Sequence, residues 1–220
     1  MYLIKTPGLI QGLFPNFIWR IPTNEKTVFF TFDDGPIPEV TPWVLDKLEY
    51  YNAKATFFCV GENIEKHPDV FEMVKEANHD VGNHTYNHLN GWATDKIPYF
   101  HNIRKCANMV KSDFFRPPYG KIRPSQVEFL QRHYKIVMWD VLSADFDQDI
   151  SKEQCLNNVL RSVKPGSIVV FHDSIKAWKN LKYVLPNALD ILTSEGYQFR
   201  ALSSAFEKAP KGELVGNIVV

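Results

Sequence analysis

Residues 27–36 read Thr27-Val28-Phe29-Phe30-Thr31-Phe32-Asp33-Asp34-Gly35-Pro36. The β-branched and aromatic residues predict a buried strand over Val28–Phe32, and the Asp-Gly-Pro sequence predicts a turn after it. Two adjacent carboxylates, Asp33 and Asp34, therefore stand where the strand ends, and their joint ionisation requires a cation or a strong partner. Two interpretations are open at this point. The segment is either a surface turn, or a site where one Asp binds a metal and the other moves a proton.

Further apolar runs alternate along the chain with helical patterns. The other predicted strands are Ala55–Val60, Asp80–Gly82, Asp113–Phe115, Ile136–Trp139, Ile168–Phe171 and Tyr197–Leu202. The predicted helices are Pro38–Tyr50, Pro68–Ala77, Ile97–Val110, Pro124–Arg132, Lys152–Val163 and Leu181–Thr193. This alternation is typical of an α/β fold built on a parallel sheet.

Polar side chains follow several of these predicted strands. They are Asp33 and Asp34, His84, Arg116, Asp140 and Asp145, and His172. A β/α barrel places its active-site groups at the C-terminal ends of many strands, whereas a doubly wound sheet gathers them from a few. We therefore expect one barrel domain over residues 1–220, with residues 27–206 as the barrel. Residues 1–26 are less regular and are expected to close one end of it.

Composition narrows the choice of partners. The 25 basic and 25 acidic residues balance, so no bulk field attracts nucleic acid or an anionic membrane. No stretch has the roughly 18–20 uninterrupted apolar residues of a membrane helix. The three cysteines have no metal-type spacing and are expected to be reduced and buried. The N-terminal residues lack an export signal, which predicts a cytoplasmic location, or an extracytoplasmic one if a signal has been removed.

Two histidines stand four residues apart in Asn83-His84-Thr85-Tyr86-Asn87-His88. They face the same way if the segment is helical, so that both can hold one ion. Asp34 then supplies a third ligand. Two His and one carboxylate with open positions fit catalytic zinc and also non-haem iron. The alternative is a pair of surface histidines on a loop.

Two other segments add candidate catalytic groups. Residues 116–120 read Arg116-Pro117-Pro118-Tyr119-Gly120, a stiff loop suited to holding a backbone N–H toward an oxyanion. Arg116 either keeps Asp33 ionised or forms a structural ion pair on a Pro-rich turn. His172 ends a predicted strand, where a single His is often structural. Asp145 would orient it and raise its pKa toward the role of an acid.

Together, five segments resemble the polysaccharide deacetylase family, also called the NodB-homology or carbohydrate esterase family 4. They are Thr31–Pro36, His84–His88, Arg116–Gly120, Trp139–Asp145 and Val170–His172, in the order of the family's motifs. The resemblance runs from about residue 26 to about residue 206 and implies a distorted (β/α)7 barrel. It also implies metal-dependent removal of acetyl groups from N-acetylated sugars or polysaccharides.

The resemblance assigns roles to individual residues. It implies Asp33 as the general base, with Arg116 holding it, and Asp34, His84 and His88 as the metal ligands. It implies that Tyr119 offers its backbone N–H to the oxyanion and that Asp145 orients His172, the general acid. The expected metal is Zn²⁺, with Co²⁺, Ni²⁺ and Fe²⁺ as alternatives.

Two positions depart from the family pattern. Phe146 stands where many members have Trp, and Val170 stands where many have Leu. Both positions line the acetyl pocket in relatives, so these two residues leave more than one acyl group and more than one sugar as candidate substrates. The alternatives are an O-acetyl esterase on xylan-type glycans, a small-amide hydrolase on the same site, and a glycan-binding module without turnover. Every expected catalytic position is filled, which speaks against the last.

Overall fold

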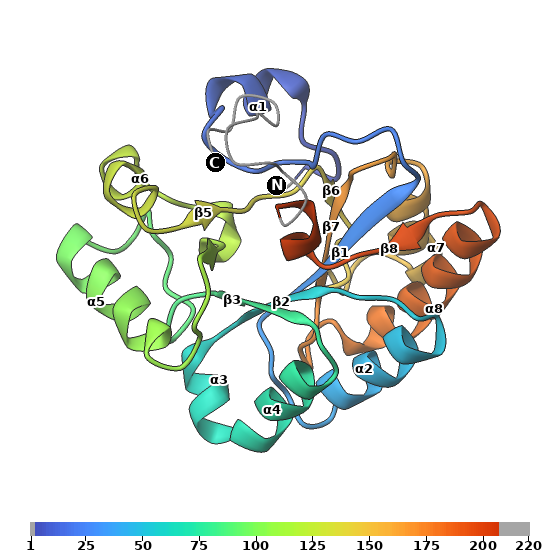
Figure 1. Ribbon diagram of the computed structural model, residues 1–220, viewed down its shortest axis with the longest axis horizontal. Helices are drawn as coiled ribbons and strands as arrows, with labels where there is room; N and C mark the ends of the chain where they lie inside the picture. The colour runs from blue at the N-terminus through green and yellow to red at the C-terminus, as the bar shows by residue number, and fades with distance from the viewer. Residues whose placement is uncertain (1–2, 207–220) are drawn as a thin grey trace.

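A computed structural model describes residues 3–206 of the chain (Figure 1). Its strands are β1 (Thr27–Asp33), β2 (Thr56–Cys59), β3 (Asp80–Asn83), β4 (Phe114–Phe115), β5 (Lys135–Ile136), β6 (Val141–Leu142), β7 (Ile168–His172) and β8 (Gln198–Phe199). Its α-helices are α1 (Gly8–Leu13), α2 (Thr41–Tyr50), α3 (Gly61–Lys66), α4 (Pro68–Glu76), α5 (Lys96–Ala107), α6 (Pro124–Leu130), α7 (Lys152–Leu160) and α8 (Trp178–Ser194).

The strands form one curled parallel sheet in the order β5-β4-β3-β2-β1-β7-β6. Helices α2 to α8 surround its outer side, as Figure 1 shows. The predicted α/β fold, a distorted (β/α)7 barrel, is thereby confirmed. The barrel is distorted because, within residues 3–206, its edge strands β5 and β6 do not pair with each other.

The strands that make up this sheet differ in two places from the prediction. The expected strand Ile136–Trp139 ends early, and a separate strand, β6, follows it. The carbonyl oxygens of Val137 and Met138 accept hydrogen bonds from the Arg116 side chain, at 3.2 and 2.9 Å. The predicted last strand, Tyr197–Leu202, is shortened to β8 in the structure. This strand pairs with the start of β1 and is not part of the strand order given above. Helices α1 and α3 were not predicted.

The N-terminal segment fills the gap between the two edges of the sheet. Ile18 forms a parallel bridge to Val137 beyond β5, and Arg20 forms an antiparallel bridge to Ser167 before β7. Lys5 bridges Val141 in β6. The expectation that residues 1–26 close one end of the barrel was therefore incomplete, because residues 5–20 run along its open side. In Figure 1 this segment, with α1, lies apart from the other helices.

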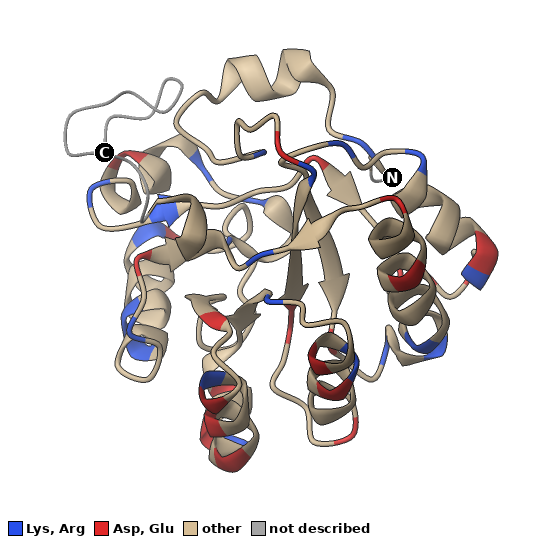
Figure 2. Ribbon diagram, turned by 45° about the vertical axis from the view of Figure 1, so that its right-hand side comes forward, with Lys and Arg blue, Asp and Glu red and all other residues tan. Residues whose placement is uncertain are grey.

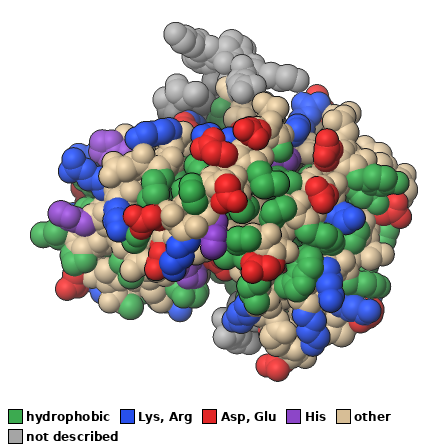
Figure 3. Space-filling model, turned by 90° about the horizontal axis from the view of Figure 1, so that it is seen from below, with side chains coloured by type: hydrophobic (Ala, Val, Ile, Leu, Met, Phe, Trp, Pro, Cys, Tyr) green, Lys and Arg blue, Asp and Glu red, His purple; other side chains and the backbone are tan. Residues whose placement is uncertain are grey.

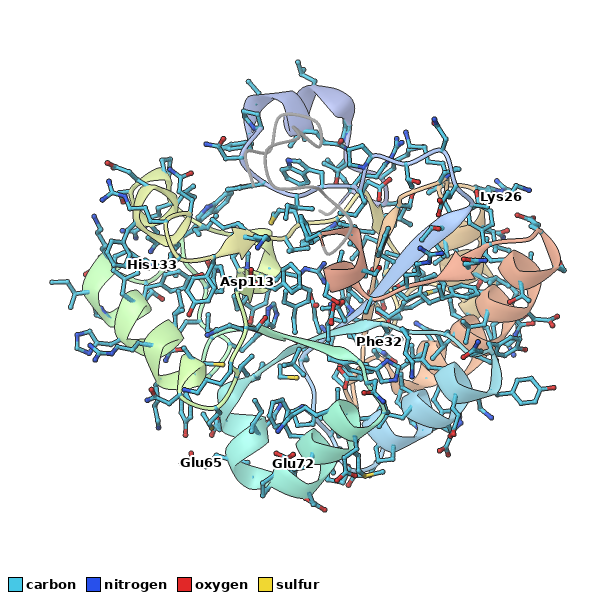
Figure 4. All side chains as sticks on the ribbon, in the orientation of Figure 1. Lys26, Phe32, Glu65, Glu72, Asp113 and His133 are labelled. Atoms are coloured by element: carbon cyan, nitrogen blue, oxygen red, sulfur yellow. The ribbon has the colours of Figure 1, made fainter. Side chains whose placement is uncertain are left out.

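Strand β1 is buried on both faces, and its residues alternate between two apolar clusters. Val28, Phe30 and Phe32 pack toward the helices, whereas Phe29 joins a cluster inside the barrel with Phe58 and other residues. Figure 4 shows Phe32 inside the ring of helices, while Glu65 and Glu72 project outward from α3 and α4. Because side chains alternate along a strand, Thr31 and Asp33 share the inward direction of Phe29.

The charged residues lie mostly on the outer helices. Figure 2 shows basic and acidic residues on the same helices. On the face seen in Figure 3, acidic, basic and hydrophobic side chains are interspersed. This mixture agrees with the balanced composition. Among the described residues, no helix combines the length and the apolar character needed to cross a membrane.

Candidate active site

Asp33 is the last residue of β1 and points into the barrel. It lies in register with His172 at the end of β7 and with Phe58 in β2. Its carboxylate is almost completely buried and accepts a 2.7 Å hydrogen bond from Arg116. The ion pair gives this buried carboxylate the cationic partner that a buried charge requires.

Arg116 follows β4 and is completely buried. Besides Asp33, its guanidinium donates to the Thr31 hydroxyl at 2.7 Å and to two backbone carbonyl oxygens, and it lies 4.1 Å from the centre of the Phe58 ring. Burial lowers the pKa of Arg116, and the Asp33 charge opposes that shift. Every contact holds the planar guanidinium in one orientation, so the side chain presents Asp33 to the pocket in a single geometry.

Asp34, His84 and His88 bring three candidate metal ligands together. One ligand atom from each lies within 4.8 Å of the others. The Oδ1 atom of Asp34 is 3.1 Å from His88 Nε2 and 3.8 Å from His84 Nε2. Asp34 reaches this position because its backbone is left-handed, with φ of 82°, directly after the strand. Adjacent carboxylates thus enter one cavity from different directions.

The two histidines meet through a turn and not through a helix. Thr85 and His88 both have positive φ, 64° and 57°, and the rings of His84 and His88 are 5.1 Å apart. The helical geometry considered for this pair is therefore absent, although the rings do converge. The Thr85 hydroxyl accepts a hydrogen bond from the Leu89 amide at 3.0 Å and stabilises the turn.

Hydrogen bonds leave Nε2 of both histidines directed at Asp34. His84 Nδ1 is 2.8 Å from the Arg116 carbonyl oxygen, which requires a proton on Nδ1 and a lone pair on Nε2. His88 Nδ1 lies 3.1 Å from the Tyr119 hydroxyl. Burial lowers the pKa of His84 to about 4, so its imidazole is neutral near pH 7. Such bonds at the second ring nitrogen are usual for metal-binding histidines.

These residues fit a divalent metal ion. The buried Oδ1 of Asp34 has no hydrogen-bond partner among the described residues, although the Nε2 atoms of His84 and His88 face it. Burial opposes ionisation of Asp34, but the neighbouring histidines, His88 foremost, outweigh it and lower its pKa. A bare, ionised oxygen beside two imidazole lone pairs is a typical donor set for a catalytic metal site with open positions.

His172 stands on the other side of the pocket from these ligands. Its Nδ1 is 2.7 Å from Asp145 Oδ1, and its backbone N–H donates to Asp145 Oδ2 at 2.8 Å. Burial opposes protonation, but the Asp145 charge and hydrogen bond outweigh it and raise the pKa of His172 to about 9. His172 is therefore an imidazolium near pH 7, and Asp145 orients it so that Nε2 faces the cavity.

A cavity of about 490 Å³ joins the two sides. Its polar lining consists of two carboxylates, three histidines, a tyrosine and two lysines: Asp33, Asp34, His84, His88, His172, Tyr119, Lys121 and Lys176. Its apolar lining consists of Trp139, Leu142, Phe146 and Val170. The two positions that depart from the family pattern thus lie in the wall, and the Phe146 ring meets His172 edge-on at 5.1 Å. Trp139 and Leu142 were not predicted as pocket residues. Tyr119 lies at its edge with a left-handed backbone, φ of 61°.

Asp140 does not belong to this site, contrary to its expected place beside Asp145. Its carboxylate accepts hydrogen bonds from the Ser167 hydroxyl at 2.9 Å and from the Ile168 amide at 2.8 Å. Both partners are at the start of β7, whereas His172 is at its end. Asp140 therefore anchors the opposite end of the barrel, and the short strand β6 separates it from Asp145.

Asp173 is a residue of the site region to which no role was assigned from the sequence. It is buried, accepts a hydrogen bond from the Gly35 amide at 3.0 Å and shares a 2.6 Å hydrogen bond with the Thr41 hydroxyl. A Cβ on Gly35 would lie 2.0 Å from its Oδ2. Burial raises the pKa of Asp173 to about 8. The only available signal was its position after His172, because both of its partners are more than 130 residues away.

Comparison with known proteins identifies the family of this chain. Residues 20–135 match the family model described as "Polysaccharide deacetylase". The chain is 35% identical over 194 residues to a peptidoglycan-N-acetylglucosamine deacetylase of Bacillus cereus, covering 84% of this chain and 70% of the relative. The chain belongs to the polysaccharide deacetylase family. The family match ends before Asp145 and His172, so their placement rests on the structure.

Two further proteins are similar to this chain. A chitooligosaccharide deacetylase of Azorhizobium caulinodans is 32% identical, with 70% of this chain and 77% of the relative covered. Among solved structures, a peptidoglycan N-acetylglucosamine deacetylase in complex with 4-naphthalen-1-yl-N-oxidanyl-benzamide superimposes with a TM-score of 0.82 at 34% identity. That match covers 88% of this chain and 94% of the other. The fold and the family thus agree with the sequence-based expectation.

Proposed function

We propose that this protein is a hydrolase that removes acetyl groups from N-acetylglucosamine units of a glycan, with a divalent metal ion bound by Asp34, His84 and His88. The observation that carries the proposal is the convergence of two different sets of groups on one cavity. The buried Asp33–Arg116 pair and the Asp34 ligand set lie on one side, and the His172–Asp145 pair lies on the other.

The chemistry divides between the two sides of the cavity. An amide carbonyl is a poor electrophile and an amine is a poor leaving group. A bound metal ion supplies Lewis-acid polarisation of the carbonyl and lowers the pKa of a bound water. Asp33, kept ionised by Arg116, accepts a proton from the attacking water. The Tyr119 backbone N–H donates to the carbonyl oxygen as negative charge develops on it.

His172 completes the reaction from the opposite side. As an imidazolium it donates the proton on Nε2 to the sugar nitrogen while the carbon–nitrogen bond breaks. The products are acetate and a free amine. The small apolar walls formed by Leu142, Phe146 and Val170 suit the methyl of an acetyl group. For the metal, we propose Zn²⁺, because two His and one carboxylate with open positions are a common catalytic zinc set.

Acetate release and metal content test this proposal together. The purified protein, loaded with Zn²⁺, is expected to release acetate from N-acetylglucosamine oligomers. The panel also holds O-acetyl xylan and small amides, which represent the alternative substrates. Asp34→Ala and His84→Ala should each lose the metal and the activity. The matched control is His101→Ala, since His101 is an exposed histidine on α5 outside the cavity.

Two results would contradict the proposal. Metal content equal to the parent in Asp34→Ala and His84→Ala would refute the ligand assignment. Acetate release from O-acetyl xylan alone would refute the N-acetyl assignment and favour an esterase.

A further inference from the structure

One side chain of α5, Asn102, forms its hydrogen bonds with the turn that carries the proposed histidine ligands. Its Oδ1 atom accepts from the backbone amides of Tyr86 at 2.7 Å and Asn87 at 3.3 Å. Its Nδ2 atom donates to Asn87 Oδ1 at 2.6 Å. Because two backbone N–H groups require an acceptor, they determine which atom of the Asn102 amide is the oxygen. Asn102 does not line the cavity and takes no part in the proposed reaction.

The turn needs support from outside itself. Thr85 and His88 both have left-handed backbones, with φ of 64° and 57°. Residues with a Cβ persist in this conformation where the surrounding structure holds them there. The Tyr86 and Asn87 amides lie between these two residues, and in the part of the chain that the structure describes both have Asn102 Oδ1 as their acceptor. Asn102 therefore binds the backbone of the turn between its two left-handed residues.

The first half of the turn is held by other groups. The Thr85 amide donates to Asn83 Oδ1 at 2.9 Å, and Asn83 is a completely buried residue at the end of β3. The Thr85 carbonyl oxygen accepts from the Gly61 amide at 3.0 Å, at the start of α3. The backbone beside His84 is thus fixed without Asn102. The bonds of Asn102 fall on the second half of the turn, directly before His88.

The side chains of the two histidines differ in the same way. His84 is 2% exposed, and its Nδ1 is 2.8 Å from the Arg116 carbonyl oxygen in the barrel interior. His88 is half-buried, and its Nδ1 partner is the hydroxyl of Tyr119, which is 60% exposed. A buried hydrogen bond is stronger than an exposed one because the local dielectric is lower. The direction of His88 Nε2, 3.1 Å from Asp34 Oδ1, therefore depends mainly on the backbone of its turn.

We propose that Asn102 is a positioning residue for the metal site and acts through this turn and His88. Its amide keeps the His88 ring beside Asp34 in the metal-free protein, so that metal binding does not have to order the turn first. Ligands that are held in place beforehand bind more tightly for this reason. The inference rests on the proposed function, because it assumes the ligand set Asp34, His84 and His88.

Hydrogen exchange in the metal-free protein tests the contact itself. Asn102→Leu keeps nearly the same shape but removes the acceptor. Asn102→Asp keeps an acceptor oxygen and allows the Asn87 side-chain amide to rotate and donate to it. Measured by NMR, the Tyr86 amide should exchange at least about fivefold faster in Asn102→Leu, the effect of one lost hydrogen bond. In Asn102→Asp its exchange rate should equal that of the parent.

Metal affinity and ligand geometry test the consequence. Competition with a chromophoric chelator should give a Kd for Zn²⁺ about tenfold or more higher in Asn102→Leu, as for other residues that orient ligands, and close to the parent in Asn102→Asp. The visible absorption of Co²⁺-loaded Asn102→Leu should approach that of His88→Ala, because the same ligand is displaced. A general loss of stability would not produce that spectrum.

Asn187→Leu is the matched control. Asn187 is also a half-buried asparagine on a helix, α8, and its side-chain amide donates to the Tyr183 carbonyl oxygen at 2.7 Å, outside the cavity. The Kd for Zn²⁺ and the Co²⁺ spectrum of this variant should equal those of the parent.

Asn87→Ala keeps the inference testable if Asn102→Leu does not fold. It shortens an exposed side chain and removes one bond to Asn102, so the Kd for Zn²⁺ should rise about twofold or more. An unchanged Kd in this variant would overturn the inference. Parent-like exchange or Kd in Asn102→Leu, or equal effects of Asn102→Leu and Asn102→Asp, would also overturn it.

A parent protein that binds no Zn²⁺ would contradict the proposed function instead. The exchange rates need no metal, so they would still test whether Asn102 holds the turn. Equal rates in the parent and Asn102→Leu would then overturn that role as well.

Discussion

Asp33 and Arg116 form an ion pair in which both side chains are almost completely buried. The two charges can be buried only because each has the other and because the guanidinium has three more acceptors. Lys at position 116 could not replace this planar fork of donors. The two adjacent carboxylates therefore have different partners. Asp33 is bound to the cationic side chain of Arg116, and Asp34 faces the histidines.

Asp33→Asn is expected to retain the metal and lose activity. Asn has nearly the same shape and still accepts a hydrogen bond from Arg116, but it cannot accept a proton from water. We expect kcat to fall by about 100- to 10,000-fold, the usual contribution of a general base. Metal analysis and acetate release measure the two outcomes. Asp46→Asn, which alters an exposed carboxylate on α2, is the control. Normal turnover in Asp33→Asn would mean that another residue is the base.

His172 gives a pH-dependent prediction. Its folded-state pKa, about 9, lies above its ordinary value of 6.5. The acid form, and the stability gained from the Asp145 pair, are therefore complete below about pH 6.5 and are lost as pH rises through about 9. Asp145→Asn removes the charge that raises this pKa. The alkaline limb of the kcat/KM profile should move to lower pH, together with a loss of activity. An unshifted limb would exclude His172 as the acid.

At the scale of elements, the turn between β1 and α2 is held by a residue from the end of β7. The carboxyl group of Asp173 bonds the Gly35 amide and the Thr41 hydroxyl, and that hydroxyl also accepts from the Ile37 amide. The Asp173 amide in turn donates to the Asp33 carbonyl oxygen at 3.1 Å. The strand that carries His172 therefore also positions the turn that carries Asp34.

Asp173→Ala is expected to weaken metal binding without removing any ligand. Without the acceptor for the Gly35 amide, Asp34 loses its fixed left-handed conformation, and the Kd for Zn²⁺ should rise by about tenfold or more, as for other groups that orient ligands. Competition with a chromophoric chelator measures this. Asp173→Asn keeps an acceptor for Gly35 and a polar partner for Thr41, so it should bind Zn²⁺ nearly as well as the parent. Equal weakening by Ala and Asn would contradict this role.

For the whole molecule, the open side of the barrel depends on the N-terminal segment. Phe17 and Trp19 pack in one cluster with residues from α5 and α6 and with Met138, whose carbonyl oxygen holds Arg116. The Trp19 indole N–H donates to the Phe14 carbonyl oxygen at 3.0 Å. The segment thus supports the wall that positions Arg116 beside Asp33. These two residues are 83 positions apart in the sequence.

Trp19→Ala is expected to destabilise the fold by about 3–5 kcal/mol, the usual cost of removing a buried Trp side chain. The free energy of unfolding from urea titration measures the change. Leu9→Ala on α1 is the control, because Leu9 is 80% exposed and its truncation should change stability by about 0.5 kcal/mol or less. A small effect of Trp19→Ala would mean that the sheet holds its shape without the segment.

The sequence by itself determined the alternation of strands and helices, the family and the candidate catalytic and ligand residues of the site. Apolar periods of two and 3.6 residues are local properties, and a polar residue at a strand end shows its position without any knowledge of its partners. Asp33, Asp34, His84, Arg116, Asp145 and His172 were named on such grounds, and His88 was named from its spacing to His84.

Only the tertiary structure decided how those residues approach one another and what supports them. The left-handed turns at Asp34, Thr85 and His88, the separation of Asp140 from Asp145, and the place of residues 5–20 along the open side depend on contacts distant in sequence. So do the bonds of Asp173. These contacts follow from strand order and sheet curvature, which the free energy of packing the whole chain determines and which no local pattern of residues encodes.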